Sequence, residues 1–401
     1  MRRTSSFRPG IGEGRPSFGS PCIRDVPLKT DTSTPLIGLG TSIPTTVVTQ
    51  DDSTAFAHAL CAHTEHQREW VIPLHAGTGI DTRYMVLPEQ LIRDFREQTA
   101  LSGSCFLPDG SADDRGPTTG ERMAIYAEEA GKLALLSVRR AIESAKIDPA
   151  TITHLVTVSC TGFFSPGVDF QLIRELGLAT TVERVHVGFM GCHGSINGLR
   201  TARALARSSP DAVVLMCATE LCSLHYHYGW SPGRVIANAL FADGSAAAIL
   251  THPSRAPSAG LRVVDTASCL IPDSAAEMSW IVGDNGFEMV LTRRVPGLIA
   301  EHLRPWADAW LARHDLTTET VAGWVIHPGG PKILEAAATT LGITAEQLAP
   351  SRAILADYGN MSSPTVMFIL DRVRQSGIVG PVVMLAFGPG LIAEGALLQM
   401  R

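Results

Sequence analysis

Short apolar runs alternate with amphipathic stretches along most of the chain. Runs rich in Val, Ile and Leu predict buried strands, because a strand covered on both faces carries few polar residues. Apolar residues at helical spacing predict helices between them, and this alternation is typical of the α/β class. The predicted strands are residues 35–41, 154–160, 182–187, 212–218, 247–251, 261–269, 287–292, 321–326, 382–387 and 395–400. The predicted helices are residues 50–61, 64–74, 118–145, 169–176, 196–207, 295–313, 331–341 and 362–375.

The strand and helix alternation restarts after residues 253–260, a stretch of Pro, Ser, Ala and Gly that marks a boundary. Two halves with a similar order of elements, residues 35–255 and 256–401, predict a layered fold built by internal duplication. Residues 1–34 are rich in Gly, Pro, Ser, Thr and Arg and show little periodicity. We expect them to form a mobile N-terminal extension.

Composition narrows the class of protein. The 401 residues are 45% hydrophobic and 18% charged, which fits a globular protein with a large core. A formal charge of −6 argues against nonspecific binding to nucleic acid. No secretory signal and no apolar run of about 18 residues is found, so we expect a cytoplasmic protein without stable membrane insertion. The eight cysteines show no C-x-x-C pair and no zinc-site spacing, which predicts reduced thiols and no metal site.

Cys192 occupies the most distinctive stretch of the sequence. It lies between the predicted strand 182–187 and the predicted helix 196–207, with Gly191 before it and Gly194 two residues after it. A cysteine at a helix start faces the positive end of the helix dipole, which favours the nucleophilic thiolate. The glycines allow close approach of a substrate. The alternative is a buried structural cysteine, which is the commoner role of an isolated free cysteine.

Two polar residues stand at strand or helix ends in the second half. His327 ends the predicted strand 321–326, and Asn360 precedes the predicted helix 362–375. Ligand sites of open α/β sheets gather beyond the carboxyl ends of strands. Each residue also has a structural interpretation, His327 as a satisfied core histidine and Asn360 as a helix N-cap. Together with Cys192 they suit carbon–carbon bond formation from thioesters, with the imidazole and the amide stabilising an enolate.

These motifs resemble the type III polyketide synthases, the chalcone-synthase-like branch of the thiolase superfamily. The resemblance covers residue 36 to the end of the chain. It rests on Gly-Cys at 191–192, His-Pro-Gly-Gly at 327–330, Tyr-Gly-Asn-Met-Ser-Ser at 358–363, and Phe-Gly-Pro-Gly at 387–390, where Ala386 replaces the family's first glycine. It implies an αβαβα homodimer that uses malonyl-CoA and acyl-CoA without a cofactor or a carrier protein.

The resemblance also implies roles for individual residues. Cys192 would carry the acyl group, and His327 with Asn360 would drive malonyl-CoA decarboxylation and condensation. The implied substrate-binding residues are Phe241 and Met289 at the two gatekeeper positions, Thr161 and Cys222 in the cavity wall, Glu220, and Gly388 with Pro389 in the loop. Small residues at 161 and 222 suggest a tunnel for a fatty acyl starter, as in bacterial alkylpyrone and alkylresorcinol synthases. Glu220 would orient water or assist cyclisation to a pyrone or resorcinol, or else be a buried acid paired locally.

One stretch departs from the family pattern. Plant members hold the CoA phosphates with a cluster of Lys and Arg, whereas residues 68–80 of this chain have Trp70, Pro73, His75 and Gly77. Arg68 is the only basic residue of this stretch besides His75. Lys332, next to a predicted helix start, is another candidate for the phosphates. How the phosphates are held therefore stays open.

Three other interpretations fit part of the pattern. A ketoacyl synthase of the fatty-acid priming type also uses Cys, His and Asn, but lacks the Pro-Gly-Gly and Phe-Gly-Pro-Gly motifs. A non-catalytic thiolase-fold module that binds acyl-CoA would not need all three polar residues. A cysteine hydrolase would need an acidic residue to orient the histidine, and no recognisable motif supplies one.

Overall fold

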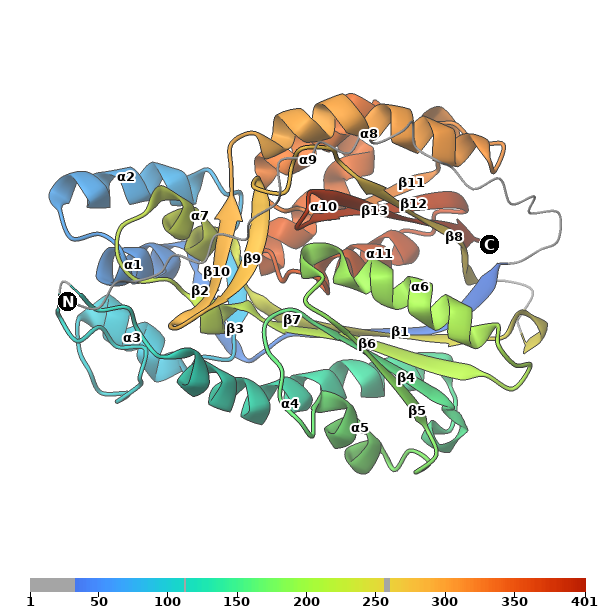
Figure 1. The fold of residues 1–401 in the computed structure, drawn as a ribbon, viewed down its shortest axis with the longest axis horizontal. Coiled ribbons are helices and arrows are strands. Elements are labelled where there is room, and N and C mark those ends of the chain that lie inside the picture. Colours follow the sequence, from blue (N-terminus) through green and yellow to red (C-terminus); the bar gives the residue numbers. More distant parts are fainter. Residues whose placement is uncertain (1–32, 112, 256–259) are drawn as a thin grey trace, which may run out of the picture. The chain divides into compact units, whose positions relative to one another are not determined.

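Nine strands form one mixed sheet, shown in Figure 1. The computed structural model describes residues 33–111, 113–255 and 260–401. The strand order across the sheet is β11-β12-β13-β8-β1-β7-β6-β4-β5. The strands are β1 (Thr34–Ser42), β4 (His154–Ser159), β5 (Glu183–Gly188), β6 (Val213–Leu221), β7 (Asp243–Thr251), β8 (Leu261–Leu270), β11 (Gly323–Ile326), β12 (Gly380–Gly388) and β13 (Ile392–Met400).

The pairing pattern shows that the fold repeats itself. In the first half β4 runs parallel to β6, β6 antiparallel to β7, and β7 antiparallel to β1. In the second half β11 runs parallel to β12, β12 antiparallel to β13, and β13 antiparallel to β8. The two halves of the sheet join where residues 34–36 of β1 pair with residues 261–263 of β8. The predicted α/β fold of two duplicated halves is confirmed, while the division into residues 35–255 and 256–401 stays a prediction.

Helices form three layers around the two halves of the sheet (Figure 1). The middle layer contains α6 (Gly194–Ala206) and α11 (Thr365–Gln375), whose buried side chains share one apolar cluster with strands of both halves. α4 (Thr119–Ala145) and α5 (Val168–Leu176) cover the outer face of the first half. α8 (Val295–Ala312), α9 (Pro331–Leu341) and α10 (Ala345–Tyr358) cover the outer face of the second. This is the predicted αβαβα arrangement of a thiolase-like fold.

Shorter elements gather at one end of the layered core (Figure 1). They are α1 (Gln50–Leu60), α2 (Glu65–Ala76), α3 (Glu89–Glu97), α7 (Pro232–Leu240), β2 (Thr46–Thr49), β3 (Thr82–Met85), β9 (Met278–Gly283) and β10 (Gly286–Leu291). The hydrophobic pattern of the sequence did not indicate six of the elements, namely α3, α7, α10, β2, β3 and β9. Most of these are short, and α10 contains Pro350, which weakens a helical pattern.

The predicted N-terminal extension and the predicted strand 182–187 both belong to the first part of the chain. The predicted mobile extension, residues 1–34, lies outside the described residues except for Ser33 and Thr34, and Thr34 begins β1. The run at 182–187 forms strand β5 but is not buried, and Val185 is 39% exposed. The reason is that β5 is the last strand of the sheet and pairs only with β4. An apolar pattern alone cannot distinguish a central strand from an edge strand.

Candidate active site

Cys192 lies in a strand-turn-helix unit between β5 and α6. The φ angles of Phe189 and Gly191 are positive, 61° and 73°, and they bend the backbone just before the thiol. A β-carbon on Gly191 would lie 2.6 Å from Cδ of Pro389. Both the backbone angle and this contact exclude a larger residue. The loop at residues 387–390 of the second half therefore packs directly against the turn that holds Cys192.

The second half presents a similar turn just before α11. Gly359 and Ser362 have φ angles of 71° and 59°. The Ser362 hydroxyl donates to Sγ of Cys192 at 3.6 Å, and the Asn360 side chain lowers the pKa of the same thiol, against the rise caused by burial. Helices α6 and α11 belong to the two repeated halves, so two helix starts converge on one sulfur.

The orientation of Asn360 is fixed by its neighbours. Its Oδ1 accepts from the backbone N–H of Ser362 at 2.8 Å, which leaves its NH₂ group for the thiol. Its backbone exchanges hydrogen bonds of 2.9 Å with Leu240 and Ala242, on either side of Phe241. The same short bridge therefore positions Asn360 and Phe241 together.

His327 follows β11 and is 1% exposed. Its backbone N–H donates to the carbonyl of Leu385 at 2.8 Å, but neither ring nitrogen has a hydrogen-bond partner among the described residues. Burial, together with the nearby imidazole of His193, lowers the pKa of His327 to about 3. The ring is therefore neutral at pH 7 and offers one N–H and one lone pair.

The protonation state of Cys192 differs from the expectation. Burial raises the pKa of the Cys192 thiol to about 11, the charge of Glu220 acts in the same direction, and the hydrogen bonds from Ser362 and Asn360 oppose both. Desolvation thus outweighs the helix start that was expected to favour the thiolate. A base has to accept the thiol proton when Cys192 reacts.

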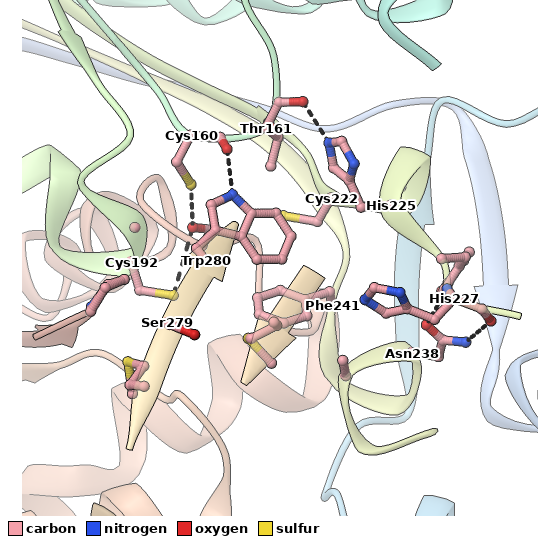
Figure 2. A pocket seen from close by; sticks show the side chains of 17 residues that line it. Cys160, Thr161, Cys192, Cys222, His225, His227, Asn238, Phe241, Ser279 and Trp280 are labelled. Atoms are coloured by element: carbon pink, nitrogen blue, oxygen red, sulfur yellow. Dashed lines mark hydrogen bonds between the residues drawn. The ribbon is translucent and has the colours of Figure 1, made fainter. Parts of the chain in front are cut away.

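A largely apolar pocket opens beside Cys192 (Figure 2). Of the residues predicted to bind substrate, Thr161, Cys222, Phe241, Met289 and Pro389 line this pocket together with Cys192. Glu220, Gly388, His327 and Asn360 do not line it. Glu220 lies behind Thr161, and Asn360 lies beside Ser362, which contacts the thiol.

Gly388 and Glu220 support the wall from behind. A β-carbon on Gly388 would lie 2.3 Å from the His193 ring, so only glycine fits there. Glu220 is fully buried and accepts hydrogen bonds from the hydroxyls of Thr161 at 2.7 Å and Ser363 at 2.6 Å. Burial raises the pKa of Glu220, and these hydrogen bonds oppose the rise. The described contacts fit a buried acid that fixes the position of Thr161.

His193 is a polar residue of the site that the sequence analysis missed. Its Nδ1 lies 2.7 Å from Oδ1 of Asn197, whose NH₂ group donates to Glu394 at 3.0 Å. Because a carboxylate only accepts hydrogen bonds, this chain places the His193 proton on Nδ1 and leaves the lone pair on Nε2. That Nε2 is buried without a partner among the described residues. Its position next to Cys192 in the sequence was the available signal.

The described residues contain neither a metal-binding cluster nor a membrane-spanning helix. No group of three or more His, Cys, Asp or Glu side chains there is arranged to hold a metal ion. In the same part of the chain, no helix combines the length and the apolar character needed to cross a bilayer.

A thiolase-like fold with a partly buried thiol, a neighbouring amide and a neutral imidazole in the second half defines the class of acyl-transferring enzymes. Comparison with known proteins gives the family. The chalcone and stilbene synthase N-terminal domain matches residues 28–253, and the C-terminal domain of the same family matches residues 262–400. The chain therefore belongs to the chalcone and stilbene synthase family, the type III polyketide synthases.

Individual relatives cover nearly the whole chain. The alpha-pyrone synthesis polyketide synthase-like Pks18 of Mycobacterium tuberculosis is 32% identical over 90% of this chain and 90% of its own length. The 1,3,6,8-tetrahydroxynaphthalene synthase of Streptomyces peucetius is 32% identical, covering 92% of this chain and 94% of its own. The crystal structure of PKS-I from the brown alga Ectocarpus siliculosus superposes with a TM-score of 0.84 at 33% identity, covering 92% of this chain and 98% of that one.

Proposed function

We propose that this type III polyketide synthase loads an acyl group from a CoA thioester onto Cys192 and extends it with malonyl-CoA. The observation that carries the proposal is the meeting of Ser362 and Asn360 with the Cys192 thiol at a buried point between the two halves. A non-catalytic binding module has no need for this arrangement. The family comparison does not favour a priming ketoacyl synthase or a hydrolase.

Loading requires a proton transfer and a thioester exchange. A neutral imidazole accepts the thiol proton, and the thiolate attacks the carbonyl carbon of the acyl-CoA. The bond from that carbon to the CoA sulfur breaks, and CoA leaves with the proton as a thiol. His327 and His193 are neutral imidazoles, and His193 directly follows Cys192 in the chain, so one of these two rings is proposed to hold this proton.

Extension requires an enolate to be stabilised. Malonyl-CoA loses carbon dioxide, and the electron pair of the broken bond forms an enolate on the remaining thioester. The N–H of neutral His327 and the NH₂ of Asn360 are proposed to donate to its oxygen. The enolate carbon then attacks the acyl carbonyl on Cys192 and releases the thiolate. Cyclisation to a pyrone or a resorcinol follows, with Thr161 at the cavity wall and Glu220 behind it.

The function is tested by incubating the protein with malonyl-CoA and acyl-CoAs of increasing chain length. We expect carbon dioxide release and pyrone or resorcinol products detected by mass spectrometry. The Mycobacterium relative is named for alpha-pyrone synthesis, and this name favours a pyrone. If the wild-type protein releases no carbon dioxide from malonyl-CoA, the proposed function is wrong.

The starter is proposed to be a fatty acyl group, with Thr161 and Cys222 in the wall that the chain passes. The pocket has a volume of about 50 Å³, below the roughly 300 Å³ of usual ligand pockets, so wall side chains have to move for a long chain. Cys222→Phe adds a ring to this wall, and we expect it to shift the preferred starter to shorter chains by at least several carbons. The measurement is the product profile over the acyl-CoA panel. Cys105→Phe, at an exposed cysteine, is the matched control. An unchanged profile in Cys222→Phe rejects the tunnel.

A homodimer is part of the proposal. The edge strand β5 carries the exposed Val185, and the exposed Met190 lies two residues after the end of this strand. The exposed Phe163 and Phe170 follow β4, the strand that pairs with β5. Exposed apolar residues around an edge strand favour association with a second copy. We expect a dimer mass in sedimentation at micromolar concentration and a shift to monomer in Val185→Lys. A monomeric wild-type protein contradicts this part of the proposal.

The residue that binds the CoA phosphates can also be proposed. Trp70 is half-buried against Trp230, 5.3 Å between ring centroids, so an aromatic pair occupies a position where plant relatives carry a basic residue. Lys332 is exposed at the start of α9, where a helix N-terminus favours anions. We therefore propose that Lys332 binds the CoA phosphates.

We also propose that the protein is located in the cytoplasm, where CoA thioesters are made.

A further inference from the structure

His227 presents an unpaired polar group to the pocket. The residue is 7% exposed and lines the pocket, and its hydrogen bonds with the described residues are made by its backbone. Figure 2 shows its imidazole directed toward Phe241, with Cys192 on the opposite side of the pocket. A buried polar group without a partner costs free energy unless a ligand or water satisfies it.

The backbone of His227 is held independently of its ring. Oδ1 of Asn238 accepts from the His227 N–H at 3.0 Å, and Nδ2 of Asn238 donates to the His227 carbonyl at 2.9 Å. The thiol of Cys61 donates to the same carbonyl at 3.3 Å. The ring therefore projects into the pocket from a fixed backbone, and a change of side chain leaves these three bonds in place.

Neighbouring polar groups in the wall are already engaged. Nε2 of His225 lies 2.6 Å from the carbonyl of Thr161, and its Nδ1 accepts from the N–H of Phe287 at 3.0 Å. The Thr161 hydroxyl donates to Glu220 and accepts from the N–H of Leu221 at 2.9 Å. His225 and Thr161 are therefore satisfied within the protein, whereas His227 is not.

The ring chemistry defines the ligand group. Burial lowers the pKa of His227 to about 4, and the positive charges of Arg234 and Arg122 add to this effect. The imidazole is thus neutral at pH 7 and offers one N–H and one lone pair. A neutral imidazole can hydrogen-bond a ketone or hydroxyl oxygen, but it cannot form an ion pair with a carboxylate.

We propose that His227 is a substrate-binding residue that hydrogen-bonds a neutral oxygen on the acyl chain carried by Cys192. This inference rests on the proposed function, because the chain must extend from Cys192 past Phe241 to reach the ring. The oxygen comes either from a substituent of the starter or from a keto group introduced by extension. A plain alkyl segment at this place leaves the imidazole unpaired, so oxygenated chains are preferred.

The test measures binding without catalysis, in a Cys192→Ala background that cannot be acylated. Three probes of equal chain length are compared by calorimetry: hexanoyl-CoA, 5-oxohexanoyl-CoA and 3-oxohexanoyl-CoA. We expect one oxo probe to bind roughly five- to tenfold more tightly than hexanoyl-CoA, the size of one neutral hydrogen bond. Extension with malonyl-CoA places keto groups on odd-numbered carbons, so a preference for the 3-oxo probe assigns the oxygen to the last extension and a preference for the 5-oxo probe assigns it to the unit before.

The matched variants separate hydrogen bonding from shape. His227→Leu should bind all three probes with equal affinity, and His227→Gln should keep part of the preference. His63→Leu removes an exposed imidazole that does not line the pocket and should keep all of it. A preference that survives in His227→Leu, or is absent with His227 in place, overturns the inference. Carbon dioxide release by the wild-type protein is measured separately, so a failure of the proposed function is recognised on its own.

Discussion

Cys192→Ala should abolish acyl loading and chain extension, with product formation falling by at least roughly 10³-fold. Alanine keeps the turn between β5 and α6 but removes the sulfur to which the acyl group is bound. Burial raises the pKa of the neighbouring Cys160 and Cys222 thiols well above the usual value, which disfavours their reaction with the acyl-CoA. Intact-protein mass spectrometry after mixing with an acyl-CoA measures the loss directly. The wild-type protein should gain the mass of one acyl group, and Cys192→Ala should gain none.

Cys192→Gln separates loading from decarboxylation. If His327 and Asn360 act on malonyl-CoA without the thiol, this variant should still release carbon dioxide while forming no extended product. Cys105→Ala, at an exposed cysteine, should keep both activities. An acyl adduct on Cys192→Ala would reject Cys192 as the nucleophile. Loss of carbon dioxide release in Cys192→Gln would reject the division of roles between the thiol and the two donors.

The layered core was predictable because its signals are local. Continuous apolar runs marked the central strands, and glycines around Cys192 marked a turn at a helix start. Element order then indicated the duplication, which the matching strand pairing of the two halves bears out. The edge position of β5 was not predictable, because burial of a strand depends on whether a second strand pairs with its free side.

The polar environment of the site was only partly predictable. Glu394 is 197 residues from Asn197, so no local pattern indicates the chain of hydrogen bonds that orients His193. The high pKa of Cys192 results from burial by several distant segments, whereas the sequence shows only the helix that follows it. His227 stands in a stretch with two histidines and two tyrosines, residues 225–228, where only the fold reveals which ring faces the pocket without a partner among the described residues.

Asn360→Asp should lower carbon dioxide release from malonyl-CoA by roughly 10²–10³-fold, the usual effect of removing one oxyanion donor. Aspartate keeps the oxygen that accepts from the Ser362 N–H, so the turn before α11 is preserved. It replaces the NH₂ group near the thiol with a second oxygen, and its negative charge repels the developing enolate. Steady-state measurement should show the loss mainly in kcat.

His327 provides the matched comparison for this donor role. His327→Gln keeps an N–H donor and should retain more decarboxylation than His327→Leu, which has none. If both donors act on the same enolate oxygen, the double variant Asn360→Asp with His327→Leu should lose less than the product of the two single losses, because donors to one charge act as a unit. Losses that multiply in full would mean that the amide and the imidazole act at different steps, one on the malonyl thioester and the other on the acyl group of Cys192.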